Sequence, residues 1–211
     1  MNKVLEVKDL SFAYNKNLIL ENISCSVNKG EFVALVGENG QGKTTFMRLI
    51  IGQLKSKTGS ICYGPNEKVG YVPQLSAAIS NNFPITVKEI LALNLPSRKI
   101  FPSKEEEDLI DANLDLVGLK DKKHSLYSDL SGGQKQKVML AKALIAEPSI
   151  LLLDEPLIGL DDSSKKSFID LLVHQSQIHN ISIIMISHEL EDIEDKIDRT
   201  FKIQGGRLEE C

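Results

Sequence analysis

The chain has 211 residues, of which 42% are hydrophobic, and its formal net charge at pH 7 is −4. This length favours one globular domain, or one core with an inserted subdomain, that can bury a substantial apolar interior. The acidic balance provides no broad basic field, which argues against DNA or RNA as the main partner.

Alternating apolar residues and turn residues predict strands in the first third of the chain. The predicted strands are 4–10, 18–27, 31–37, 60–64 and 68–74. The third of them is a nearly continuous apolar run, which is typical of a buried parallel strand. It leads through a glycine-rich loop into a predicted helix over 43–54.

The middle of the chain changes to helical patterns and the last third returns to alternating strands and helices. Thr86 and Ser103 each begin a Ser/Thr-x-x-Glu sequence, the capping box that satisfies free N–H groups at a helix start. The predicted helices are 86–95, 104–117, 132–146 and 162–179, and the last two strands are 149–154 and 181–187. This alternation predicts an α/β fold with a parallel sheet covered on both faces.

The sequence GENGQGKT, at 37–44, fits the phosphate-loop pattern G-x-x-x-x-G-K-[ST] without departure. Its glycines let backbone N–H groups cradle phosphate oxygens, while Lys43 supplies charge to the β- and γ-phosphates and Thr44 offers a hydroxyl to Mg²⁺. We therefore predict a nucleoside triphosphate site. The residues expected to contact the nucleotide in this loop are Gly37, Glu38, Asn39, Gly40, Gln41, Gly42, Lys43, Thr44 and Thr45.

The sequence ILLLDEP, at 150–156, brings two adjacent acidic residues to the end of an apolar strand. Each carboxylate alone would fit a helix N-terminus or a solvated loop. In a chain that also holds a phosphate loop, Asp154 is expected to hold Mg²⁺, and Glu155 to accept a proton from an attacking water as a general base.

The phosphate loop, LSGGQ at 130–134 and LLLDEP, in this order and spacing, resemble the ATP-binding subunits of ABC transporters. The resemblance extends from the first strand to about Asp198. It implies a P-loop NTPase fold (RecA-like) with a mostly parallel sheet, N-terminal antiparallel strands and an inserted α-helical subdomain. Residues 1–211 would form one ATPase domain, with a nucleotide-binding core of 1–74 and 148–211 and a helical subdomain of 75–147.

The same resemblance implies roles for the signature residues and for the loop after the acidic pair. The signature Ser131, Gly132, Gly133 and Gln134 would bind the ATP of a partner subunit, so the chain is expected to work as a dimer, with a homodimer favoured. Asp161 matches the acidic residue of the loop that crosses to the partner.

Further residues take their expected roles from the resemblance. Tyr14 matches an aromatic residue that stacks on adenine, although an ordinary strand aromatic remains the alternative. Gln74 matches the glutamine that senses Mg²⁺ and the attacking water, and His188 matches the histidine that contacts the γ-phosphate. The expected catalytic residues are Glu155, His188, Gln74 and Lys43, and the expected Mg²⁺ ligands are Thr44, Gln74 and Asp154. Gln41 stands where a small residue is common.

These resemblances imply an ATPase that drives transport through separate membrane permease subunits at the cytoplasmic face of the membrane. The sequence YVPQ followed by NNFPITVKEIL is similar to the branch that imports zinc, manganese or iron, and an extracytoplasmic solute-binding protein would then be a partner. The alternative is a non-transport ABC protein that acts in translation or DNA maintenance. A single domain, the lack of coiled-coil heptads and the acidic charge disfavour it.

Overall fold

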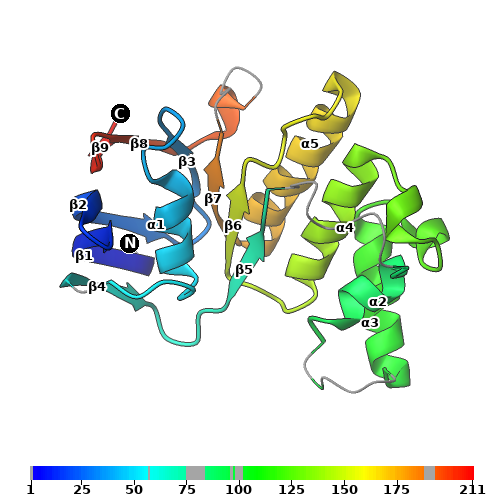
Figure 1. The fold of residues 1–211 in the computed structure, drawn as a ribbon. Coiled ribbons are helices and arrows are strands. Elements are labelled where there is room, and N and C mark those ends of the chain that lie inside the picture. Colours follow the sequence, from blue (N-terminus) through cyan, green and yellow to red (C-terminus); the bar gives the residue numbers. More distant parts are fainter. Residues whose placement is uncertain (1, 57, 75–83, 96, 98–101, 188–192) are drawn as a thin grey trace.

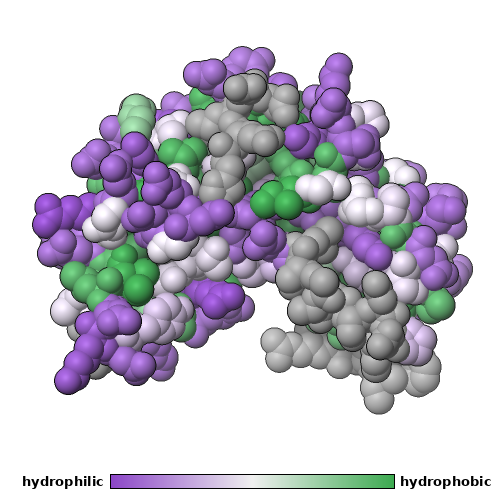
Figure 2. Space-filling view, turned by 45° about the horizontal axis from the view of Figure 1, so that its top comes forward, coloured by the Kyte–Doolittle hydropathy of each residue, from purple (hydrophilic) through white to green (hydrophobic). Residues whose placement is uncertain are grey.

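The computed structural model describes residues 2–56, 58–74, 84–95, 97, 102–187 and 193–211. Figure 1 shows a strand-rich part on the left and a helical part on the right. In Figure 2 the surface between these two parts is hollowed. Over the described residues, no helix combines the length and the apolar composition that crossing a bilayer requires.

A three-stranded antiparallel sheet holds the amino-terminal part of the chain, in the order β2–β1–β4. Its strands are β1 (Lys3–Tyr14), β2 (Asn17–Asn28) and β4 (Thr58–Tyr63). The first two are longer than the predicted 4–10 and 18–27, because their ladder continues to the pair Tyr14–Asn17 beside the turn. Asn15 adopts φ 54° in this turn, a conformation that asparagine tolerates well.

The second sheet has six strands in the order β5–β6–β7–β3–β8–β9. Its strands are β3 (Phe32–Val36), β5 (Val69–Val72), β6 (Ile150–Asp154), β7 (Ser182–Ile186), β8 (Arg199–Gln204) and β9 (Arg207–Glu210). Every pairing is parallel except β8 with β9. The predicted mostly parallel sheet is therefore confirmed, and the β8–β9 hairpin lies beyond the segment that the sequence patterns covered.

The helices follow the predicted order. They are α1 (Lys43–Ile50), α2 (Val87–Ala92), α3 (Lys104–Leu116), α4 (Gly132–Leu144) and α5 (Asp162–His179), with short 3-10 turns at Lys120–Lys122, Tyr127–Asp129 and Glu194–Lys196. The capping boxes predicted at Thr86 and Ser103 are both formed. The helix predicted over 132–146 ends earlier, because Glu147 adopts φ 51° and Pro148 follows it.

Two apolar clusters cover the faces of the six-stranded sheet. In β6, Leu151 and Leu153 belong to the cluster shared with α2, α3, α4 and α5, whereas Ile150 and Leu152 belong to the cluster shared with α1 and the antiparallel sheet. This alternation is the period of a strand buried on both sides. Helix α1 therefore lies on one face and α5 on the other (Figure 1), and the carboxyl ends of β3 and β6 lie at one edge of the sheet, where α/β folds bind their ligands.

Candidate active site

The phosphate loop connects β3 to α1, and its two flanking glycines are required by close contacts. Gly37 has φ 146°, and a Cβ there would lie 2.4 Å from the carbonyl oxygen of Ile203. Gly42 has φ 99°, and a Cβ there would lie 2.8 Å from Cδ2 of Leu20. The positive φ favours glycine at both positions, and at Gly37 a side chain would also clash with the backbone of β8.

Lys43 begins α1 and points back into the loop. Its Nζ donates hydrogen bonds to the carbonyl oxygens of Gly37 at 2.7 Å and Glu38 at 2.9 Å. The residue is 5% exposed, and burial lowers the pKa of its ammonium group, whereas the carboxylates of Glu155 and Asp154 raise it. The loop thus encloses a desolvated cation that an anionic phosphate would stabilise.

Asp154 ends β6 and is 2% exposed. It accepts hydrogen bonds from the hydroxyls of Thr44 at 3.2 Å and Tyr71 at 3.3 Å. Burial is the largest influence and raises the pKa of this carboxyl, while the two hydroxyls lower it and Glu155 raises it. The structure brings Thr44 and Asp154 together as predicted, and their hard oxygen atoms fit Mg²⁺, whose charge would offset the burial of the carboxylate.

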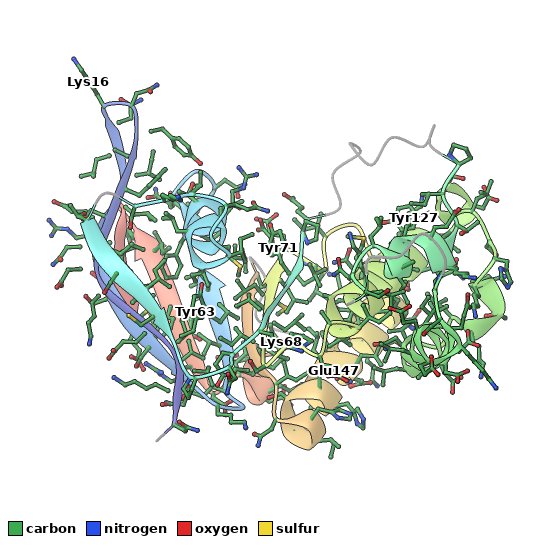
Figure 3. The ribbon with its side chains drawn as sticks, turned by 90° about the horizontal axis from the view of Figure 1, so that it is seen from below. Lys16, Tyr63, Lys68, Tyr71, Tyr127 and Glu147 are labelled. Atoms are coloured by element: carbon green, nitrogen blue, oxygen red, sulfur yellow. The ribbon has the colours of Figure 1, made fainter. Side chains whose placement is uncertain are left out.

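Tyr71, on β5, is a residue of this site that the sequence patterns did not reveal. Figure 3 shows it between the strand-rich part and the helical part of the molecule. Burial, together with Asp154, raises the pKa of its phenol to about 12, so the hydroxyl is protonated and donates at neutral pH. The only signal in the sequence was its place three residues before Gln74, a residue that the resemblance assigned to the ATP site.

Gln74 and Glu155 meet after two neighbouring parallel strands. The pair Val72–Leu153 aligns β5 with β6, and Nε2 of Gln74 donates a hydrogen bond to Oε2 of Glu155 at 2.9 Å. Glu155 adopts φ 50°, the left-handed region that non-glycine residues rarely enter. Such backbone strain is frequent at functional sites, where surrounding structure maintains it.

The signature LSGGQ forms the amino end of α4. Ser131 is its N-cap: its hydroxyl accepts the Gln134 N–H at 3.3 Å, and its own N–H donates to Oε1 of Gln134 at 3.0 Å. A Cβ on Gly133 would lie 2.8 Å from Oγ of Ser164, on the first turn of α5. The signature is therefore a rigid helix start packed against another helix start.

Asp161 caps α5 beside the signature. Its carboxylate accepts hydrogen bonds from the Ser164 N–H at 3.0 Å and from the hydroxyls of Ser163 at 2.6 Å and Ser164 at 2.7 Å. These bonds lower the pKa of Asp161. The predicted partner-contacting residue thus has a clear structural role within its own chain, as the N-cap of α5.

The amino ends of α1 and α4 lie on opposite sides of β6 and β7 (Figure 1). The phosphate loop and the signature are therefore two separate glycine-rich helix starts on one chain. Residues 20–158, which include both, match the family model described as ABC transporter. The chain belongs to the ABC transporter ATP-binding family.

Relatives of this ATP-binding chain agree with that assignment. It is 37% identical to the zinc uptake system ATP-binding protein ZurA of Listeria innocua, over 96% of this chain and 83% of that protein. It is 32% identical to the high-affinity zinc uptake system ATP-binding protein ZnuC of Bacillus subtilis, over 96% of this chain and 92% of that protein. Among solved structures, it resembles CbiO1 of Clostridium perfringens, part of the ABC transporter complex CbiONQ, with a TM-score of 0.86, 27% identity and coverage of 99% and 88% of the two chains.

Family membership confirms the predicted P-loop NTPase fold and the predicted activity, hydrolysis of ATP to drive transport. The alternative of a protein acting in translation or DNA maintenance is not supported, because these relatives are transporter subunits. Subunits of ABC transporters work with membrane permeases, so the chain is a component of such a complex.

Two further residues expected in the ATP site, Tyr14 and His188, are not part of the hydrogen-bonded groups described above. Tyr14 lies at the end of β1, is 42% exposed and packs edge-on against Phe12 with ring centroids 4.9 Å apart. Its outer surface is thus accessible to an adenine ring. His188 lies outside the described residues, directly after Ser187 at the end of the β7 segment.

Proposed function

We propose that this ATPase drives the import of zinc, with manganese as the next candidate cargo. The observation that carries this proposal is the 37% and 32% identity, over most of each chain, to relatives named for zinc uptake. The ion need not contact the ATPase itself. Among the described residues, no group of three or more histidine, cysteine, aspartate or glutamate side chains could hold a metal.

We infer that two copies of the chain bind two ATP molecules between them. In each site, the phosphate loop of one copy would hold the nucleotide and Ser131 to Gln134 of the other copy would meet its γ-phosphate. The position of the two motifs on opposite sides of β6 and β7 supports this arrangement (Figure 1). A helix N-terminus with glycines favours a phosphate group, and Asp161, beside the signature, would lie at the same interface.

Hydrolysis would use the groups that meet at the ends of β3, β5 and β6. Lys43 would stabilise negative charge on the phosphates, and Glu155, oriented by Gln74, would take the proton of the attacking water. Thr44, Asp154 and Gln74 would hold Mg²⁺, which supplies positive charge to the phosphate oxygens when bound. His188 would contact the γ-phosphate, and Tyr14 would stack on adenine.

The partners of the proposed importer are a pair of integral permease subunits and an extracytoplasmic solute-binding protein, with the ATPase dimer at the cytoplasmic face of the membrane. Helix α2 follows directly after the segment that begins at Gln74. We infer that this connection carries nucleotide-dependent motion to the permease. Dimer closure and opening would then switch the permease between its two access states.

Metal uptake with and without the chain tests the proposal. In cells or vesicles that contain the permease, radiolabelled zinc should accumulate with the wild-type chain and not with Lys43→Ala, which loses the phosphate-binding cation. Uptake of manganese but not zinc would show that manganese, rather than zinc, is the transported ion. Uptake that is equal with the wild-type chain and with Lys43→Ala would contradict the proposal.

Tyr71→Phe should weaken Mg²⁺ binding at the nucleotide site, because it removes a hydroxyl that orients Asp154. More Mg²⁺ should then be needed for ATP to bind. Partners of metal ligands contribute roughly tenfold or more in affinity; at 3.3 Å the bond is long, so we expect about a fivefold rise in the Mg²⁺ concentration that gives half-maximal ATP binding. Titration with a fluorescent ATP analogue at varied Mg²⁺ measures it. Tyr127→Phe, which also removes a buried phenol hydroxyl, is the control and should not change this value.

A further inference from the structure

The phosphate loop is connected by a side chain to the turn between β8 and β9. Oε1 of Gln41 accepts a hydrogen bond from the backbone N–H of Gly205 at 2.9 Å, although the two residues are 164 positions apart. Gln41 is half-buried, and its amide carbonyl is engaged with the turn. Its side chain therefore has a partner other than a nucleotide.

The carboxyl end of β8 also contacts the start of the same loop. The carbonyl oxygen of Ile203 approaches Gly37 so closely that a Cβ would fall 2.4 Å from it. Residues of both segments, among them Gly37, Gln41 and Gln204, line a cavity of about 330 Å³. The bond from Gln41 to Gly205 is a second connection that holds the two segments together.

The turn is itself fixed to β2. The carbonyl oxygen of Gly206 accepts the Glu21 N–H at 2.8 Å, and Nε of Arg207 donates to Oε2 of Glu21 at 3.0 Å. Gly206 has φ 78°, and a Cβ there would lie 2.8 Å from the carbonyl oxygen of Ile19. The turn can therefore shift only if its contacts with β2 are broken.

We propose that Gln41 is a positioning residue, which holds the phosphate loop in its binding conformation by fastening it to the β8–β9 turn. Gly40 and Gly42, on either side of Gln41, both have positive φ, and glycines lose the most conformational freedom on ordering. A fixed contact between them reduces the entropy that nucleotide binding must remove. A small side chain at position 41 could not reach Gly205.

This inference rests on the proposed placement of the ATP phosphates in the loop of residues 37–44. Coupling between two sites is reciprocal, so a bond that favours ATP binding must itself be strengthened by ATP. The exposed Gly205, whose amide donates to Gln41, thus becomes a reporter of nucleotide binding. A side chain with a purely structural role would not produce that response.

The test combines nucleotide affinity with hydrogen exchange. Gln41→Met keeps the length of the side chain and removes its amide oxygen. We expect the Kd for a non-hydrolysable ATP analogue with Mg²⁺ to rise about threefold, the effect of losing one hydrogen bond at the surface. In the wild-type chain the analogue should slow exchange of the Gly205 amide by about the same factor, and in Gln41→Met it should not.

A second pair of variants separates the turn from the loop residue. Arg207→Ala loosens the turn from β2 and should raise the same Kd about twofold. Lys3→Ala removes an ion pair of comparable length, Lys3 with Glu6 within β1, and should leave the Kd unchanged. A wild-type Kd in Gln41→Met, or a Gly205 amide that does not respond to the analogue in the wild-type chain, overturns the inference. A wild-type chain that does not bind the analogue overturns the proposed ATP site as well.

Discussion

Glu155→Gln should reduce the steady-state ATPase rate by at least about a hundredfold while ATP still binds, because a general base contributes roughly 10² to 10⁴ in rate. Glutamine has the shape of glutamate, and its amide can still meet Gln74, whose Nε2 lies 2.9 Å from the replaced carboxylate. It cannot accept the proton of the attacking water. With hydrolysis blocked, the ATP-bound dimer should accumulate. Phosphate release measures the ATPase rate, and light scattering with MgATP measures the dimer.

The matched control is Glu147→Gln. Glu147 adopts φ 51° before β6 and Glu155 adopts φ 50° after it, so the two glutamates have nearly equal positive φ at opposite ends of one strand. Figure 3 shows Glu147 near Lys68, which lies just before β5. We expect the control to hydrolyse ATP at the wild-type rate. An unimpaired rate in Glu155→Gln would remove Glu155 from the catalytic role.

The sequence allowed the fold to be predicted wherever a local pattern carries the structure. Capping boxes located the starts of α2 and α3, and continuous apolar runs located β3, β6 and β7. Element ends were predicted less well, and some of them depend on tertiary pairing, such as the extension of β1 and β2 to the pair Tyr14–Asn17. Apolar periodicity stops before those residues, whereas the backbone ladder does not.

The candidate site likewise contains residues that local motifs predicted and contacts that they could not predict. Thr44, Asp154 and Glu155 lie in motifs whose spacing reports their chemistry, and the structure brings Thr44 and Asp154 within hydrogen-bond distance. Tyr71 and the bond from Gln41 to Gly205 could not be predicted, because each depends on which strands are neighbours. The sheet order places β5 beside β6 and β8 beside β3, and no local sequence pattern encodes this order.

Ser131→Arg should abolish cooperative ATP hydrolysis while each subunit still binds ATP. In the proposed dimer, Ser131 faces the γ-phosphate held by the partner, and an arginine side chain would occupy the space into which that nucleotide must close. The phosphate loop lies on the other side of β6 and β7 and should bind ATP with a Kd within about twofold of wild type. We expect the ATPase rate to fall by about a hundredfold and no ATP-dependent dimer to form.

The substitution also removes a helix cap, and the chain offers a control for this effect. Ser103 caps α3 with the same capping box that Ser131 forms on α4, so Ser103→Arg and Ser131→Arg should each lose about 1 kcal/mol of stability. Chemical unfolding measures that loss. Only Ser131→Arg should lose hydrolysis and dimerisation, because α3 lies outside the proposed interface. If both variants lost activity equally, helix stability would explain the result, and if Ser131→Arg hydrolysed ATP at the wild-type rate, the signature would not bind the partner's nucleotide.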